Sequence, residues 1–263
     1  MSNPADFLLD LFGLSGRSAV VVGGAGALGG AIAEGLAAAG ANIVLAGRDP
    51  EKGIERLTTL RKLGVEAEFI ACEATQRESV AALLSQTQAR FGRVDILVNC
   101  AGVNSATPYE EITDEDWRRV IDGILTSTQL GCQIFAPAMA AQPAGGCILN
   151  IGSVSAHLPL SRVFAYSAAK AGVVNLTQNV AREYATKNVR VNCLCPGFFP
   201  AEQNRKILDP ERVQNIIRGT PMHRFGEPHE LVGAAILLCS QKAGSYITGA
   251  TVYADGGFTA NRF

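Results

Sequence analysis

The sequence lacks long apolar runs, and it has no excess of either charge. Its longer apolar stretches are broken by Gly, Asn or a charged residue well before the ~18 residues that a membrane-spanning helix needs. Lys and Arg number 23 and Asp and Glu number 24, so the net charge of −1 indicates neither nucleic acid nor a membrane surface as a partner. The first residues, MSNPADFLLDLFG, lack a positive region and carry two aspartates, which makes them a poor signal peptide. We therefore expect a cytoplasmic protein that binds neither nucleic acid nor membrane.

Cysteine and histidine occur without the spacings that metal sites need. The seven cysteines include no CxxC pair, and the three histidines are not spaced as metal ligands. Most cysteines lie within apolar runs such as RVNCLCP and AAILLCS, so we expect buried, reduced thiols. We expect Cys193 and Cys195 to face opposite sides of a strand and to be a poor metal pair. The sequence predicts no metal site.

Short β-rich runs alternate with helical stretches along the whole chain. The β-rich runs are apolar almost throughout, which is typical of parallel strands covered by helices on both faces. Without a linker, a repeat or a low-complexity segment, the 263 residues predict one α/β domain, a doubly wound parallel sheet of about seven strands. The predicted strands are 18–23, 42–47, EAEFIAC, 94–99, 147–153, 189–195 and ATVYADGG, and the predicted helices are 29–40, 50–63, 76–91, 114–140, 164–187 and an interrupted region over 203–239.

Ligands of such sheets bind beyond the carboxyl ends of the strands. The stretch VVGGAGALGG follows the first strand and opens a helix, so its backbone N–H groups suit a pyrophosphate, although a tight packing turn is the alternative.

After the second strand, AGRDPEK places Arg48 where an NAD site usually has a carboxylate. A guanidinium can pair with a 2′-phosphate, which favours NADP(H) over NAD(H). The alternative for Arg48 is a solvated residue at a helix start.

The stretch FAYSAAKAG places Tyr166 and Lys170 four residues apart, on one face of a predicted helix. The pair could serve packing or proton transfer. A free phenol is a poor base at neutral pH, and a nearby ammonium stabilises its phenolate. The stretch alone leaves both interpretations open.

Further motifs follow the remaining strands in a fixed order: CEAT, NCAG, GSVS and CPGFFPAEQN. Ser153, in GSVS, precedes Tyr166 by thirteen residues. Together these motifs resemble the short-chain dehydrogenase/reductase family over nearly the full length of the chain. The resemblance implies a Rossmann-type fold and hydride transfer between a nicotinamide and a carbonyl or secondary alcohol.

The resemblance also assigns residues to roles. It implies that Tyr166 is the general acid or base, that Lys170 supports it and hydrogen-bonds the nicotinamide ribose, and that Ser153 donates to the substrate oxygen. The implied cofactor contacts, besides Arg48, Tyr166 and Lys170, are Gly23, Gly26, Leu28 and Gly29 at the pyrophosphate, Glu73 and Ala74 at the adenine, Asn99, Ala101 and Gly102 at the ribose, and Pro196, Gly197 and Phe199 at the nicotinamide.

Five positions depart from the family pattern. The most serious is Ile124, which stands where the family has an Asn that helps to hold a water behind the Lys. Because Ile cannot hydrogen-bond, either the proton relay is rerouted or turnover is slowed, and a catalytically impaired cofactor-binding scaffold is an alternative. The retention of the Ser, Tyr and Lys favours an active enzyme. The other departures are Val22, Ala27, Glu73 and Ala201, where the pattern has Thr, Gly, Asp and Thr.

The substrate is indicated by the segments GGAGALGG, PGFFPAEQNR and TPMHRFGEP. They resemble those of sugar-acid and polyol reductases, in particular the fructuronate reductase and gluconate 5-dehydrogenase branch, with 198–228 expected to cover the substrate. A 3-ketoacyl carrier protein reductase, which would need a basic docking face, is the enzymatic alternative. The resemblance also implies a homotetramer. A carboxylated sugar would need a cation, and the candidates, each individually better explained as a plain surface residue, are His157, Arg162, Arg205 and His223.

Overall fold

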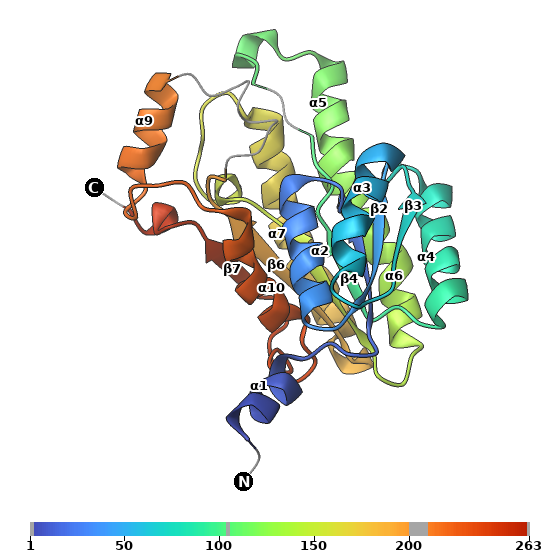
Figure 1. Cartoon of the computed structure of the whole chain (residues 1–263). Coiled ribbons are helices and arrows are strands. Elements are labelled where there is room, and N and C mark those ends of the chain that lie inside the picture. The colour runs from blue at the N-terminus through green and yellow to red at the C-terminus, as the bar shows by residue number, and fades with distance from the viewer. Residues whose placement is uncertain (1–2, 104–105, 200–209, 262–263) are drawn as a thin grey trace.

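The structure is a computed structural model that describes residues 3–103, 106–199 and 210–261. The described residues form one sheet of seven strands in the order β3-β2-β1-β4-β5-β6-β7, and every neighbouring pair is parallel (Figure 1). The predicted doubly wound parallel sheet is confirmed. The strands are β1 (Ser18–Val22), β2 (Asn42–Gly47), β3 (Ala67–Ala71), β4 (Ile96–Asn99), β5 (Gly146–Ile151), β6 (Val189–Pro196) and β7 (Thr251–Ala254).

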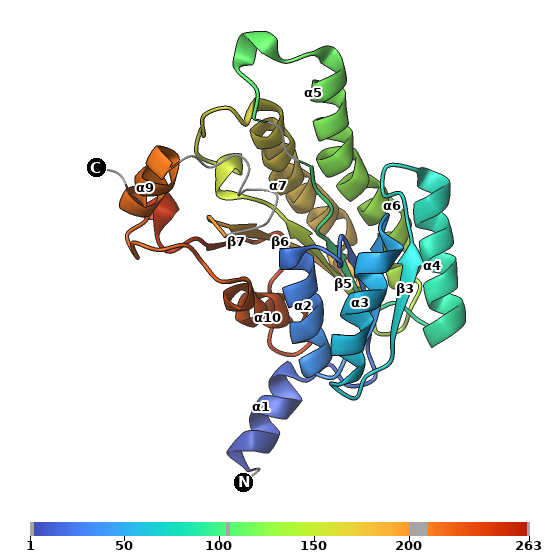
Figure 2. The ribbon, with the colours of Figure 1, turned by 45° about the horizontal axis from the view of Figure 1, so that its top comes forward.

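Helices cover both faces of the sheet (Figure 2). One apolar core joins the strands to α2, α3 and α10, and a second joins them to α4, α6 and α7. Within β1, Val21 belongs to the first core and Val20 to the second, because successive side chains of a strand point to opposite faces. The helices are α1 (Pro4–Phe12), α2 (Ala27–Ala38), α3 (Pro50–Arg61), α4 (Arg77–Phe91), α5 (Asp114–Ile121), α6 (Ser127–Ala140), α7 (Phe164–Tyr184), α9 (Pro210–Gly219) and α10 (Val232–Cys239). In the described part of the chain, no helix has the length and apolar character needed to cross a membrane.

The helix predicted over 114–140 is not continuous. Residues Asp122–Thr126 form one turn of π-helix between α5 and α6. A π turn leaves backbone carbonyls without their usual N–H partners. Here the hydroxyls of Ser127 and Thr128 donate to the carbonyl oxygen of Ile124 at 3.1 Å and 2.7 Å. Residue periodicity did not reveal this turn, since one extra residue hardly changes the apolar pattern.

The amino-terminal helix α1 was not predicted, although its start signal is present. Asn3 accepts a hydrogen bond from the N–H of Ala5 at 3.2 Å, and Pro4 occupies the first helical position. The helix projects from the body beneath the sheet in both views (Figures 1 and 2). Its carbonyl at Leu11 accepts from Ser240 Oγ at 2.7 Å. At the other end of the chain, Asn261 donates from Nδ2 to the carbonyl of Gly219, the last residue of α9, at 3.0 Å.

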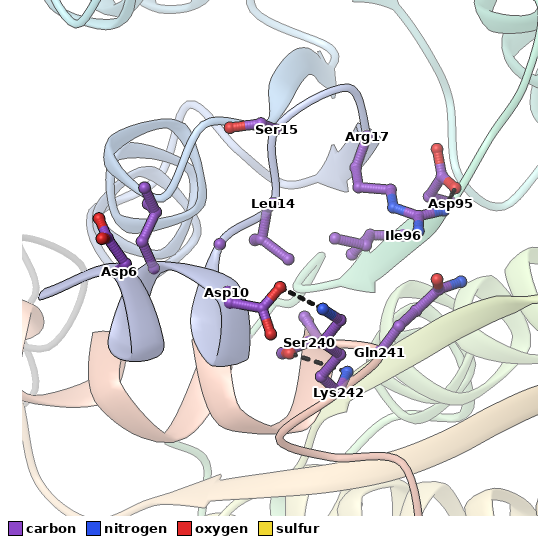
Figure 3. A pocket seen from close by; sticks show the side chains of 13 residues that line it. Asp6, Asp10, Leu14, Ser15, Arg17, Asp95, Ile96, Ser240, Gln241 and Lys242 are labelled. Carbon is purple, nitrogen blue, oxygen red and sulfur yellow. Dashed lines mark hydrogen bonds and ion pairs between the residues drawn. The ribbon is translucent and has the colours of Figure 1, made fainter. Parts of the chain in front are cut away.

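A cavity of about 480 Å³ lies at the amino ends of β1 and β4, next to α1 (Figure 3). Asp95, which is only 2 % exposed, precedes β4 and is surrounded by donors there. It accepts from Arg17 Nη1 at 2.9 Å, from Arg93 Nε at 2.8 Å and from the N–H of Ser18 at 3.0 Å. The Asp95 carboxylate and its two arginine partners therefore hold the amino ends of β1 and β4 together. Ligands of parallel sheets bind at the opposite edge.

Replacing Asp95 with Ala should lower the free energy of unfolding by about 2–3 kcal/mol, because charged hydrogen bonds are lost while both arginines keep part of their solvation. Equilibrium unfolding in urea measures the change. Asp114→Ala is the matched control, since its pair with Arg118 is exposed. Equal urea midpoints for Asp95→Ala and the control would contradict the prediction.

Candidate active site

The turn between β1 and α2 lies where the order of the strands reverses, between β1 and β4. Gly23 has φ 79°, and a Cβ there would lie 2.7 Å from the carbonyl oxygen of Cys100. A Cβ on Gly29 would lie 2.4 Å from the carbonyl oxygen of Gly23, so only glycine fits either position. The cap residue of α2 is Gly26, which has no side chain to accept from the N–H groups of the first turn. These groups suit an anion, and the compact glycine turn fits a pyrophosphate. Leu28, in the first turn of α2, packs against the core.

Arg48 and Glu73 meet at the carboxyl ends of β2 and β3. Arg48 Nη1 lies 3.9 Å from Glu73 Oε2, and the Arg48 side chain is 70 % exposed. Glu73 Oε1 accepts from the hydroxyl of Thr75 at 2.8 Å. The carboxylate of Asp49 instead caps α3 by accepting from the N–H of Lys52 at 3.2 Å. Arg48 therefore presents a positive charge at this edge. Ala74, beside Glu73, packs against the second core.

A buried chain of side chains joins the end of β4 to α7. Asn99 Nδ2 donates to Asn150 Oδ1 at 2.9 Å, and Asn150 Nδ2 donates to Thr177 Oγ1 at 2.9 Å. A Cβ on Gly131 would lie 2.3 Å from Asn99 Oδ1, so α6 passes close to the same chain. The network fixes the end of β4 relative to α7, which carries Tyr166 and Lys170. Beyond it, Ala101 is half-buried and Gly102 is exposed.

Ser153, Tyr166 and Lys170 lie at the same edge of the sheet, around the end of β5. Lys170 is 5 % exposed, and its Nζ donates to the carbonyl of Ile151, the last residue of β5, at 2.5 Å. The same Nζ lies 5.6 Å from the centroid of the Tyr166 ring. Ser153, two residues beyond Ile151, is 7 % exposed, and its Oγ accepts from the N–H and the hydroxyl of Ser155, both at 3.1 Å. With its oxygen accepting, the Ser153 hydroxyl can donate its own proton to a ligand.

Two thiols lie beneath Ser153, and their arrangement corrects an expectation. Cys193 Sγ and Cys195 Sγ are 3.7 Å apart on one face of β6. The expectation that they face opposite sides was wrong, because residues two apart on a strand share a face. Their hydrogen bond lowers the pKa of Cys195 and raises the pKa of Cys193. A Cβ on Gly152 would lie 2.4 Å from Cys195 Sγ and 2.7 Å from Cys193 Sγ.

All seven cysteines are free, and six of them are buried. The described residues contain no group of three or more His, Cys, Asp or Glu side chains that could hold a metal ion. Cys193 and Cys195 pack against Gly152, which precedes Ser153.

Ile124 is fully buried in the apolar cluster that supports α7. It shares this cluster with Ala169 and Val173, and Tyr166 packs against the same group. The position at which the family pattern has Asn is thus filled by hydrocarbon. That Ile124 reroutes the proton relay or slows turnover stays a prediction.

The end of β6 forms the opposite wall of the site. The N–H of Gly197 donates to the carbonyl of Ala254 at 3.0 Å, and a Cβ on Gly197 would lie 2.7 Å from the Cα of Asp255. Pro196 is the last residue of β6, and Phe199 is buried. The chain beyond Gly197 is therefore held tightly against the segment that follows β7.

A second cavity, of about 380 Å³, lies between the loop before α7 and the helix α9. Of the four cations predicted to border a substrate, Arg162 lines it, whereas His157 and His223 do not. The His157 ring instead lies 6.4 Å from the ring of Tyr253. Arg205, like Ala201, lies outside the described residues. The lining residues are Leu160, Ser161, Arg162, Phe198, Glu211, Arg212, Asn215, Ile216 and Phe258.

Sequence reasoning missed Arg212. Its Nη2 donates to the carbonyl of Ser161 at 2.9 Å, across 51 positions of sequence. No local motif marks such a contact, because it exists only once α9 is folded against the loop.

Comparison with known proteins gives consistent similarities. A family model described as "Enoyl-(Acyl carrier protein) reductase" matches residues 23–259. Glucose 1-dehydrogenase 2 of Bacillus subtilis is 36 % identical over 94 % of this chain and 96 % of its own length. The 2-dehydro-3-deoxy-D-gluconate 5-dehydrogenase of Formosa agariphila is 37 % identical over 96 % of each chain. The crystal structure of a gluconate 5-dehydrogenase from Burkholderia cenocepacia, in complex with NADP and tartrate, has a TM-score of 0.91 and 34 % identity, covering 96 % of this chain and 98 % of that one.

Gly152→Ala should destabilise the protein by about 1–3 kcal/mol, because the new methyl group overlaps two buried sulfurs. The melting temperature should fall by about 2–10 °C. Adding Cys195→Ala to this variant should recover part of the loss, since it removes the closer sulfur. Gly233→Ala is the control, because a Cβ there meets no atom within 4 Å. A Gly152→Ala variant as stable as Gly233→Ala would refute the packing argument.

Proposed function

The chain belongs to the short-chain dehydrogenase/reductase family, as its motif order predicted, and on that premise we propose an NADP(H)-dependent oxidoreductase acting on a sugar acid or polyol. The enzyme transfers a hydride between the nicotinamide and a carbonyl or secondary alcohol. One observation carries the proposal. The buried ammonium of Lys170 is bonded to the end of β5, beside Ser153 and within 5.6 Å of the Tyr166 ring centroid.

The proposed mechanism assigns one proton task to each side chain. Bound nicotinamide supplies or accepts the hydride. Tyr166 donates its phenolic proton to the carbonyl oxygen during reduction and accepts a proton during oxidation. Ser153 donates to the same oxygen, since its Oγ already accepts from Ser155. Lys170 has three N–H donors and uses one on Ile151, so the others can stabilise the phenolate and hold the ribose.

The cofactor contacts proposed from the sequence are supported by the geometry of the carboxyl edge. The glycine turn and the N-terminus of α2 suit the pyrophosphate. Arg48 is exposed beside Glu73, whereas Asp49 is used as a helix cap. The carboxylate of Asp49, next to Arg48 in sequence, is thus engaged at the helix start, which supports NADP(H) over NAD(H). The NADP in the Burkholderia structure agrees with this preference.

A sugar acid is supported by the sugar-acid relative and by the hydroxy acid tartrate in the Burkholderia structure. The carrier-protein alternative is less consistent with the charges around the site. Glu110 and Glu111, which are exposed after β4, are acidic, whereas a docking face for a carrier protein would be basic. Their segment contacts the start of α7, since the rings of Tyr109 and Phe164 are 4.9 Å apart.

The residues 1–263 would form a single catalytic domain, with 198–228 covering the substrate, and a cavity bordered by α9 supports that placement. We expect a homotetramer in the reducing cytoplasm, where seven free thiols are ordinary. The alternative, a catalytically impaired cofactor-binding scaffold, is based on Ile124. Measuring whether the protein turns over a carbonyl substrate distinguishes it from an active enzyme.

Tyr166→Phe tests the chemistry. A screen of NADPH oxidation with ketoses, ketouronates and acetoacetyl thioesters should show activity for the wild type with a keto sugar acid. The variant should lose about 10²-fold or more in kcat, because the proton donor is gone, and it should still bind NADPH. Tyr109→Phe, at an exposed ring, is the control. NADPH binding without turnover of any carbonyl by the wild type would favour the scaffold.

Arg48→Ala tests the cofactor preference. Loss of a charged contact to the 2′-phosphate should weaken NADPH binding about 10-fold or more and leave NADH binding unchanged. Fluorescence titration of both nucleotides measures the two dissociation constants, with Arg118→Ala as a distant control. If the dissociation constants of NADPH and NADH rise by the same factor, Arg48 does not bind the 2′-phosphate.

A further inference from the structure

The cavity beside α9 has the composition of a site for a small anion with an apolar body. Arg162 and Arg212 line it from two different elements, and Asn215 adds an amide. Among the described lining residues, Glu211 is the one carboxylate beside the two arginines. The other walls are mainly hydrophobic, from Leu160, Phe198, Ile216 and Phe258. Pockets for small ligands combine apolar walls with a few polar groups that fix orientation.

The backbone holds both arginines at this cavity. Arg212 donates to the carbonyl of Ser161 at 2.9 Å, which ties α9 to the loop before α7. Arg162, the next residue, has φ 63°, a left-handed conformation that is uncommon for a residue other than glycine. Glycine would fit this position at lower cost, and residues in such conformations are concentrated at functional sites.

The cavity adjoins the edge at which the reaction is proposed. Arg162 precedes Tyr166 by four residues, so their α-carbons are at most about 14 Å apart. Phe198, in the cavity wall, directly follows Gly197, which closes the other side of the site. A substrate whose carbonyl reaches Tyr166 can thus place its far end against Arg162.

We propose that this cavity binds the carboxylate end of an open-chain sugar acid, paired with Arg162 and Arg212, while Asn215 hydrogen-bonds its hydroxyl groups. The inference rests on the proposed function and narrows its substrate to acids rather than polyols. Arginine suits this role because its planar guanidinium can bind a carboxylate through two parallel hydrogen bonds. Two guanidinium groups attract a carboxylate, and Glu211 beside them disfavours a second one.

The test compares two six-carbon substrates that differ in the carboxylate, 5-keto-D-gluconate and D-fructose, each reduced with NADPH. Arg212→Ala should raise KM for the keto acid about 10-fold more than it raises KM for fructose, because only the keto acid loses a charged partner, and it should leave kcat for the keto acid within about twofold. Arg162→Gly should do the same, and it removes the guanidinium while suiting the left-handed backbone conformation. Arg218→Ala is the matched control, since Arg218 is on the same helix but does not line the cavity.

The outcomes separate the inference from the proposed function. An unchanged KM for the keto acid in both variants, or an equal rise for both substrates, would overturn the carboxylate site while leaving the oxidoreductase intact. If the wild type reduces neither substrate, calorimetric titration with D-gluconate and D-sorbitol in the presence of NADP⁺ decides. Gluconate binding that Arg212→Ala abolishes would support the site even then, and no gluconate binding would refute it.

Discussion

The bond between the ammonium of Lys170 and the carbonyl of Ile151 holds the candidate site together. It joins α7, which carries Tyr166, to the end of the strand that leads to Ser153. The ammonium is almost completely buried, so its charge is weakly screened and its position is restricted. The hydrogen-bonded chain from Asn99 through Asn150 to Thr177 also joins α7 to β4 and β5. The proton transfer and the cofactor binding that we propose would both depend on this junction.

Close packing defines the site as much as polar contacts do. Gly152 leaves room for two sulfurs beneath Ser153, and Gly131 leaves room for Asn99. Ile124 belongs to the same apolar cluster as Cys193 and Cys195. The departure from the family pattern is therefore part of the apolar packing that supports α7.

The fold class and most strands were predictable from sequence because strands covered on both faces are apolar along their whole length. The motif order identified the strand ends, so the glycine turn and the residues around Ser153 could be placed in advance. Three features were beyond this reasoning for physical reasons. The π turn at Ile124 adds one residue without changing the pattern, the helix at Pro4 is too short for periodicity, and the contact of Arg212 with Ser161 depends on tertiary packing. The faces of Cys193 and Cys195 could have been predicted, because strand geometry alone fixes them.

The two ends of the described chain lie at different edges of the molecule (Figure 1). Helix α1 projects beneath the amino ends of the strands, whereas Asn261 is bonded to the end of the helix that carries Arg212. Attachment to a solid support, or fusion to a second protein, would therefore leave α9 and the cavity beside it unconstrained when it is made through the amino-terminal side. The same attachment through the carboxyl-terminal side would pull on α9 directly, because Asn261 is hydrogen-bonded to its last residue. The choice of terminus should therefore affect the measured kinetics of an immobilised or fused protein.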